Sequence, residues 1–229
     1  MDEIVIAEII PYDYEESQPD TIKELRLTEE FSNQKSPFLS MYNAAMSEMN
    51  ARFEIIKEEF AFRGMRCPIH HIDTRIKSAK SIIGKLRKKN LSLTLENACN
   101  RLMDIAGVRV VCSYMKDVYT IRERIMAQDD IRIVEEKDYI QNPKPNGYRS
   151  LHIIVRVPVY FMNSKQYVPV EIQLRTVAMD LWASLEHDIM YKSINADVEI
   201  DFTSELKKCS QLIYHAEAKM EQMNNLLEE

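Results

Sequence analysis

The sequence predicts a mixed α/β (α+β) fold in which helices flank a sheet of four or five strands. Helix-like and strand-like segments alternate along the chain, as expected for a sheet with helices packed on it. The 229 residues are 45% hydrophobic, enough for one compact domain with a sizeable core. Four glycines and eight prolines are too few for a disordered or low-complexity chain.

Five segments have the spacing of amphipathic helices. The first begins with a Ser36–Pro37 cap and ends near Gly64. Its apolar residues recur every three or four positions: Leu39, Tyr42, Ala45, Met46, Met49, Phe53 and Ile56. The other four predicted helices span residues 78–90, 115–128, 179–192 and 203–229. The last carries a short a/d seam, so we expect it to pack on the domain or on a second subunit.

Shorter segments rich in β-branched residues predict the strands. They span residues 69–77, 106–114, 131–140, 151–157 and 167–174. The N-terminal segment predicts a short strand at Ile4 to Ile10 followed by a loop. We therefore expect an N-terminal arm at 1–35, a domain at 36–192 and a C-terminal helix at 193–229 that serves oligomerisation or packing.

Charge and cysteine content exclude several classes of protein. The net charge is −6, so the molecule as a whole does not attract nucleic acid. The four cysteines form no CxxC pair, and none of them is spaced from a histidine as zinc ligands are. They are therefore predicted to be free thiols in a reducing compartment. The N-terminus lacks a basic start, and no stretch reaches the length of a membrane span. We expect a soluble cytoplasmic protein without membrane association.

A basic segment is the first candidate site. Seven of the fifteen residues from Arg75 to Lys89 are basic and none is acidic. Lys77, Ser81 and Lys85 are spaced by four, which places the last two on one helix face with the first just ahead of it. Such a cluster suits a polyphosphate. The alternative is a solvated basic face, which is the commoner meaning of a basic run taken alone.

Asp104 and Arg109 flank the start of a predicted core strand. The carboxylate of Asp104 is a candidate ligand for Mg²⁺, which prefers a few carboxylates together with substrate phosphates. Arg109 is a candidate for stacking on a base or pairing with a phosphate. The structural alternative for Asp104 is a residue at a helix end or turn.

The segment from Asp138 to His152 combines a turn with chemically active side chains. Pro-Lys-Pro-Asn-Gly at residues 143–147 is a strong turn signal. The turn alone does not account for the side chains that gather around it: Lys144, Tyr148, Arg149 and His152. A nucleotide-binding edge and a plain surface turn are equally supported at this point.

Three polar residues alternate with apolar ones in the last predicted strand. Glu171, Gln173 and Arg175 point to one face, and the apolar residues between them point to the other. The polar face is either exposed to solvent or lines a cleft with a carboxylate for metal binding and proton transfer.

Together and in this order, these segments resemble the RelA/SpoT synthetase domain, and the compact chain resembles the small alarmone synthetases. The resemblance runs from about Pro68 to Lys192. It implies a nucleotidyltransferase-like sheet and transfer of the β,γ-pyrophosphate of ATP to the ribose 3′-hydroxyl of GTP or GDP. It also implies Mg²⁺ as cofactor and a homo-oligomer, with a tetramer as the family precedent.

The resemblance implies a role for each candidate residue. Asp104 and Glu171 bind Mg²⁺, and Glu171 accepts the proton of the 3′-hydroxyl. The residues implied for ATP are Arg75, Lys77, Ser81, Lys85 and Arg109, with the two arginines stacking on adenine. The residues implied for GTP or GDP are Lys144, Tyr148, His152, Gln173 and Asp180, with the tyrosine stacking on guanine and Asp180 bonding its edge.

Two stretches depart from the family pattern. Residues 135–138 (Glu-Glu-Lys-Asp) mix acidic and basic groups, so the preference between GDP and GTP stays open. Residues 70–73 (His-His-Ile-Asp) differ from the pattern expected of a cleft for product activation. Two alternative functions remain: a toxin-type enzyme that pyrophosphorylates the 3′ end of tRNA, and a non-catalytic domain that binds guanine nucleotides or RNA.

Overall fold

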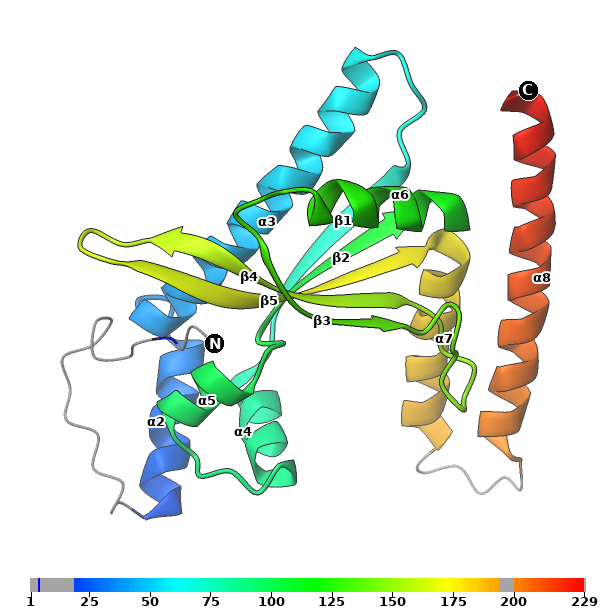
Figure 1. The fold of residues 1–229 in the computed structure, drawn as a ribbon. Coiled ribbons are helices and arrows are strands. Elements are labelled where there is room, and N and C mark those ends of the chain that lie inside the picture. Colours follow the sequence, from blue (N-terminus) through cyan, green and yellow to red (C-terminus); the bar gives the residue numbers. More distant parts are fainter. Residues whose placement is uncertain (1–3, 5–18, 194–199, 229) are drawn as a thin grey trace.

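A five-stranded mixed sheet forms the centre of the molecule (Figure 1). The computed structural model describes residue 4, residues 19–193 and residues 200–228. The strands lie in the order β1-β2-β5-β4-β3, and only β2 and β5 pair in parallel. Their bounds are Ile69–Ile76 (β1), Ala106–Cys112 (β2), Arg132–Asp138 (β3), Leu151–Tyr160 (β4) and Lys165–Thr176 (β5). The predicted fold class and the five-strand sheet are confirmed.

Seven helices surround the sheet in the described part of the chain. Helices α3 and α6 pack on one face, while α2, α4 and α5 gather at one end and α7 and α8 at the other (Figure 1). Their bounds are Asp20–Ser32 (α2), Pro37–Phe62 (α3), Ala79–Lys88 (α4), Leu95–Arg101 (α5), Met115–Met126 (α6), Val177–Ser193 (α7) and Phe202–Glu228 (α8). None of these helices is both long and apolar enough to cross a membrane.

The N-terminal region corrects one prediction. The expected loop before residue 36 is wrong for residues 20–32, which form α2. Leu27 and Phe31 lie four residues apart and are buried against the core, so tertiary packing supports a helix whose sequence is mostly polar. The predicted strand at Ile4 to Ile10 lies outside the described residues except for Ile4. The predicted division of the chain at residues 36 and 193 stays a prediction.

Helix α5 was not predicted, because its seven residues are too few for a periodic pattern. A cap nevertheless marks its start, since the Thr94 hydroxyl accepts a hydrogen bond from the backbone N–H of Asn97. The Ser36–Pro37 cap is confirmed in the same way: the Ser36 hydroxyl accepts from the N–H groups of Phe38 and Leu39, and proline occupies the first turn of α3.

The sheet separates an apolar face from a polar one. Val108, Ile153 and Ile172 are essentially inaccessible to solvent and pack with Tyr42 and Phe53 of α3. Burial of a side chain of this size contributes about 1.5–3 kcal/mol, so this layer is the main source of stability. The opposite face is left free to carry function.

Helix α8 packs on the domain through directed contacts. Trp182 of α7 donates its Nε1–H to the carbonyl oxygen of Leu206 at 2.9 Å. Further along α8, the Glu221 carboxylate accepts from the backbone N–H of Lys116, at the N-terminus of α6, at 2.8 Å. The a/d seam therefore packs at least partly within the chain. The outward side keeps exposed apolar residues: Leu212, Met220, Met223, Leu226 and Leu227.

Glu217 is a buried carboxyl on the inner side of α8 and generates a prediction for stability. Burial raises the pKa of Glu217 to about 7. The Thr176 hydroxyl and the charge of Arg149 lower this pKa, but by less than burial raises it. The pKa of Glu217 in the folded protein lies above its pKa in the unfolded chain. The contribution of Glu217 to the free energy of unfolding therefore falls as pH rises from about 4.5 to 7. We expect Glu217→Gln to be more stable than the parent at pH 8 by on the order of 2 kcal/mol, and by much less at pH 5.

Urea unfolding at the two pH values measures this difference. Glu205→Gln, at an exposed position of the same helix, is the control. It should not change the free energy of unfolding at either pH. A stability difference for Glu217→Gln that does not depend on pH would contradict the burial of an ionisable group there.

Candidate active site

Two rows of side chains cross the polar face of the sheet, because paired strands keep their residues in register. In one row Asp73, Arg109, Gln173, His152 and Lys137 stand side by side on the five strands. In the neighbouring row the corresponding residues are Arg75, Gly107, Glu171, Ile154 and Glu135. Every strand thus contributes to one continuous surface, and Glu171 lies in its centre. The cleft interpretation of the polar strand face is supported over simple solvent exposure.

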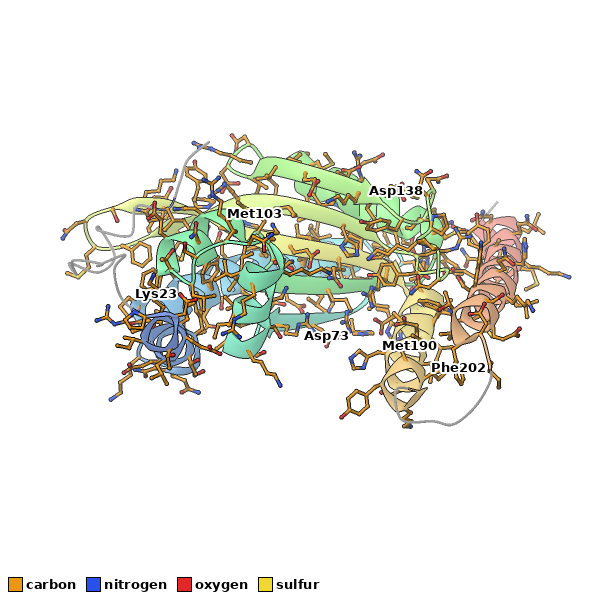
Figure 2. The ribbon with its side chains drawn as sticks, turned by 90° about the horizontal axis from the view of Figure 1, so that it is seen from below. Lys23, Asp73, Met103, Asp138, Met190 and Phe202 are labelled. Atoms are coloured by element: carbon orange, nitrogen blue, oxygen red, sulfur yellow. The ribbon has the colours of Figure 1, made fainter. Side chains whose placement is uncertain are left out.

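Two adjoining cavities open on this surface and share Asp104 and Glu171. The larger has a volume of about 390 Å³, and six of its twelve lining residues are basic: Lys85, Lys89, Arg101, Lys137, Lys144 and His152. The smaller, about 200 Å³, lies over β1 and β2 and is lined by Arg75, Gly107, Arg109 and Gln173, among others. Figure 2 views this side of the molecule from below, with Asp73 and Met103, one from each lining, labelled. The shared carboxylates lie where the contents of the two cavities would meet.

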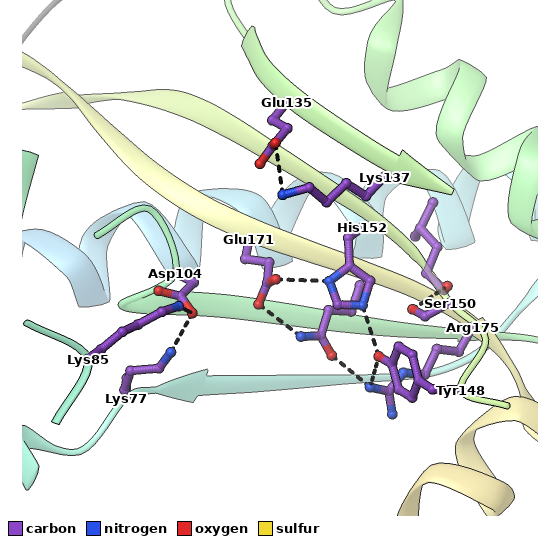
Figure 3. Close-up of polar contacts among 12 residues, drawn as sticks. Lys77, Lys85, Asp104, Glu135, Lys137, Tyr148, Ser150, His152, Glu171 and Arg175 are labelled. Carbon is purple, nitrogen blue, oxygen red and sulfur yellow. Dashed lines mark hydrogen bonds and ion pairs between the residues drawn. The ribbon is translucent and has the colours of Figure 1, made fainter. Parts of the chain in front are cut away.

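Asp104 is held by the two lysines that the sequence placed together. The ammonium groups of Lys77 and Lys85 both bond its Oδ2 atom (Figure 3). Burial by itself would raise the pKa of Asp104, but the two lysines outweigh it and lower the pKa. The other oxygen, Oδ1, is buried and has no hydrogen-bond partner. A buried, ionised carboxylate with one free oxygen is a suitable ligand for a divalent cation.

Glu171 belongs to a closed ring of hydrogen bonds (Figure 3). Its Oε1 pairs with Nδ1 of His152 at 3.0 Å, and its Oε2 accepts from Nε2 of Gln173 at 2.9 Å. The Gln173 carbonyl oxygen accepts from Arg175 at 3.0 Å. Arg175 also donates to the Tyr148 hydroxyl at 2.6 Å, and that hydroxyl pairs with Nε2 of His152 at 2.9 Å.

The charge of Glu171 fixes the direction of the bonds to it. Glu171 only accepts when ionised, so Nδ1 of His152 and Nε2 of Gln173 both donate to it. The Tyr148 hydroxyl accepts from Arg175 and pairs with Nε2 of His152. Burial raises the pKa of Glu171, but the hydrogen bonds from His152 and Gln173 outweigh burial and lower it. The ring thus keeps Glu171 ionised and fixes the direction of its lone pairs.

An aromatic cluster borders the larger cavity: Tyr139 and His152 line it, and Tyr148 packs against both. The rings of Tyr139, Tyr148 and His152 meet edge to face, with centroids between 5.3 and 6.2 Å apart. The Lys144 ammonium lies 4.8 Å from the Tyr139 ring and 4.6 Å from the Tyr148 ring. This arrangement favours the nucleotide-binding interpretation of the turn over a plain surface turn.

Asp180, in the first turn of α7, is engaged by two arginines. Its Oδ1 accepts from Arg175 at 3.2 Å and lies 3.5 Å from Arg109. Arg109 also lies 4.0 Å from Asp73. Asp180 therefore joins the polar face of the sheet to α7, next to the ring.

Most of the predicted site residues come together around the two cavities. Ser81 lies at the edge of this group: it is exposed, and its hydroxyl pairs with that of Ser78 at 2.9 Å. Several lining residues were missed, among them Lys89, Arg101, Lys137 and Tyr139. Lys89 belongs to the basic run and Tyr139 to the turn segment, so both had a sequence signal, whereas Arg101 lies in the unpredicted helix.

The carboxylates fit Mg²⁺ better than a metal held by protein ligands alone. Within the described ranges, no group of three or more His, Cys, Asp or Glu residues is arranged to hold a metal. Two carboxylates beside a basic cavity suit an ion whose remaining ligands are phosphate oxygens and water.

Sequence comparison identifies the family. Residues 74–196 match the family described as the region found in RelA / SpoT proteins, and the chain belongs to this family. It is 44% identical to the GTP pyrophosphokinase YwaC of Bacillus subtilis (strain 168), over 80% of this chain and 86% of that protein. It is 34% identical to the GTP pyrophosphokinase YjbM of the same organism, over 68% and 72% of the two chains.

Solved structures agree with this assignment. The crystal structure of small alarmone synthetase 2 from Bacillus subtilis superposes with a TM-score of 0.73 at 42% identity, covering 85% of this chain and 98% of that one. Small alarmone synthetase 1 from the same organism, bound to its product pppGpp, gives a TM-score of 0.75 at 29% identity, with 84% and 97% covered.

The ring predicts that Arg175 stabilises the fold as well as the site. Its side chain is 7% exposed and bonds Gln173, Tyr148 and Asp180. Arg175→Met keeps most of the volume but removes the buried donor that Gln173, Tyr148 and the half-buried carboxylate of Asp180 share. We expect a loss of about 3 kcal/mol in the free energy of unfolding, measured in urea. The control is Arg63→Met, at an exposed ion pair, which should cost at most about 0.5 kcal/mol. Equal losses would refute the role of the ring.

Proposed function

We propose that the protein is a (p)ppGpp synthetase that transfers the β,γ-pyrophosphate of ATP to the ribose 3′-hydroxyl of GTP or GDP, a GTP diphosphokinase that makes the alarmone of the stringent response. The observation that carries the proposal is the pair of adjoining cavities that share Asp104 and Glu171. A transfer between two nucleotides needs two binding sites that meet at the reacting atoms. Membership in the RelA/SpoT family and the named activities of the relatives support it.

The smaller cavity is proposed to hold the adenine of ATP. Arg75 and Arg109 line it from neighbouring strands, and guanidinium planes stack well on a purine. Lys77 and Lys85 lie where the polyphosphate would enter, with Ser81 at the margin. These charges would neutralise the phosphates, which is the main requirement of phosphoryl-type transfer.

The larger cavity is proposed to hold the acceptor. Tyr148 would stack on guanine, and Asp180 would accept hydrogen bonds from its N–H groups once freed from its arginines. Lys144 and His152 would contact the acceptor phosphates, and Gln173 holds the carboxylate of Glu171 in place.

The reaction step is assigned to Glu171. The 3′-oxygen forms a bond to the β-phosphorus of ATP, the bond between that phosphorus and the oxygen bridging it to the α-phosphorus breaks, and AMP leaves. Glu171 accepts the proton of the 3′-hydroxyl, and its lowered pKa keeps it available as a base at neutral pH. Mg²⁺, held by Asp104 and Glu171, would supply charge neutralisation at the transferred group.

Three further points belong to the proposal. The exposed apolar side of α8 is compatible with the expected homo-oligomer, of which a tetramer is the precedent implied by the resemblance. The basic run is compatible with RNA binding. A cytoplasmic location fits the substrates. The two alternative functions gain no support: both carboxylates that a non-catalytic domain would lose are present, and the relatives named here are pyrophosphokinases.

The direct test is an assay of purified protein with ATP, Mg²⁺ and GMP, GDP or GTP side by side. We expect a 3′-pyrophosphorylated product from at least one of them without tRNA. Glu171→Gln should lower kcat by about 10²–10⁴-fold, because a neutral amide cannot accept the proton. The control is Glu136→Gln on β3, whose carboxylate pairs with Arg122 outside the cavities. Full activity of Glu171→Gln would show that the base is another group.

The division between donor and acceptor sites makes a second prediction. Arg75 lines only the smaller cavity and Lys144 only the larger. Arg75→Ala should raise KM for ATP by roughly tenfold with little effect on the guanine nucleotide, and Lys144→Ala should do the reverse. Initial-rate kinetics with each substrate varied in turn measure both. The opposite pattern would exchange the assignments of the two cavities.

A further inference from the structure

The turn that carries Lys144 and Tyr148 lies directly against helix α8. Gly147 in this turn has a φ of +94°, a conformation that suits glycine. A Cβ atom at Gly147 would stand 2.8 Å from the Cβ of Ser210 and 3.0 Å from the Cα of Lys207. The turn and α8 therefore approach so closely that only glycine fits between them.

A hydrogen bond fixes this close approach. The Ser210 hydroxyl donates to the carbonyl oxygen of Gly147 at 2.5 Å, and the serine is 5% exposed. The space remaining between the turn, α7 and α8 is about 10 Å³, room for at most one water molecule. Loss of the hydroxyl would leave the Gly147 carbonyl oxygen buried without its donor, so the turn would have to move to regain a partner.

The other end of the turn rests on the same helix. The guanidinium of Arg149 lies 4.1 Å from the centre of the Tyr214 ring, four residues along α8 from Ser210. Arg149 also donates to the carbonyl oxygen of Ile140 at 2.6 Å, which ties the start and the end of the turn segment together. Ser210 and Tyr214 thus lie on the same face of α8. They contact Gly147 and Arg149, the residues directly before and after Tyr148 in the sequence.

None of the described residues of α8 is among those that line the two cavities. Any effect of Ser210 or Tyr214 on the reaction therefore acts through the elements they contact, the turn and helix α7, and the two directed contacts above are with the turn. The residues proposed to bind ATP lie on β1, β2 and α4 and on the link between β1 and α4, and α4 is at the other end of the sheet from α8 (Figure 1).

We propose that Ser210 and Tyr214 are positioning residues for the guanine-nucleotide acceptor: they seat the turn that presents Lys144 and Tyr148, and so set the affinity for the acceptor without affecting that for ATP. This proposal rests on the proposed function, because it assigns the turn to the acceptor.

The test compares Ser210→Ala with Cys209→Ala, a neighbour on α8 whose side chain is exposed. We expect Ser210→Ala to raise KM for GDP by roughly 5- to 50-fold, with KM for ATP and kcat within about twofold of the parent. Tyr214→Leu should show the same selective change, since it removes a separate contact with the turn. Cys209→Ala should leave all three constants unchanged.

The single tryptophan provides a readout that is independent of turnover. Trp182 is 4% exposed, bonds α8 and lies edge to face with Tyr148 at 6.3 Å. Its emission should stay that of a buried indole in both variants, and titration with GDP should give a weaker Kd. If Ser210→Ala shows the emission of the unfolded chain, the KM and Kd values of Tyr214→Leu test the proposal instead.

Two outcomes overturn the proposal: an unchanged KM for GDP in a folded variant, or equal increases in KM for GDP and ATP. Failure of the proposed function is distinguishable from either. In that case the parent protein itself gives no product, while the fluorescence titration still shows whether the two contacts affect binding of the guanine nucleotide.

Discussion

The parallel pairing of β2 with β5 is the constraint on which the site depends. It places Gly107 opposite Glu171 and Arg109 opposite Gln173, and the chain just before β2 brings Asp104 to the same place. Side chains alternate between the faces of a strand, so a shift of one residue would turn Glu171 into the core and Ile172 into the cleft. The apolar layer under the sheet prevents that shift, because it would expose buried Ile172 and Leu174. Core packing and the geometry of the candidate site are therefore two results of one register.

The same alternation explains how much could be predicted from the sequence. The polar face of β5 and the lysines beside Asp104 follow from spacing, since period two and period four fix which side chains lie together. Helix α5 and the orientation of Tyr139 do not follow from any local pattern. They depend on contacts between distant parts of the chain, such as the rings of Tyr139 and His152.

The polar face also limits what the sequence alone could say about Asp180. Spacing places it in a helix after the last strand, but its two arginine partners come from β2 and β5. A half-buried carboxylate between two guanidinium groups joins α7 to the sheet, and under the proposed function it would also accept hydrogen bonds from a ligand with N–H donors. Its partners come from distant strands, which is why its structural role is not evident from its neighbours in sequence.

The two lysines on Asp104 have a consequence for how the protein handles charge. Asp104 already serves them as a counter-ion, so under the proposed function a polyphosphate would have to draw the ammonium groups of Lys77 and Lys85 away from this carboxylate. Its binding free energy would then be the difference between two ionic interactions, each partly shielded from bulk salt by burial. Such an exchange would favour densely charged ligands over single phosphates, whichever base they carry.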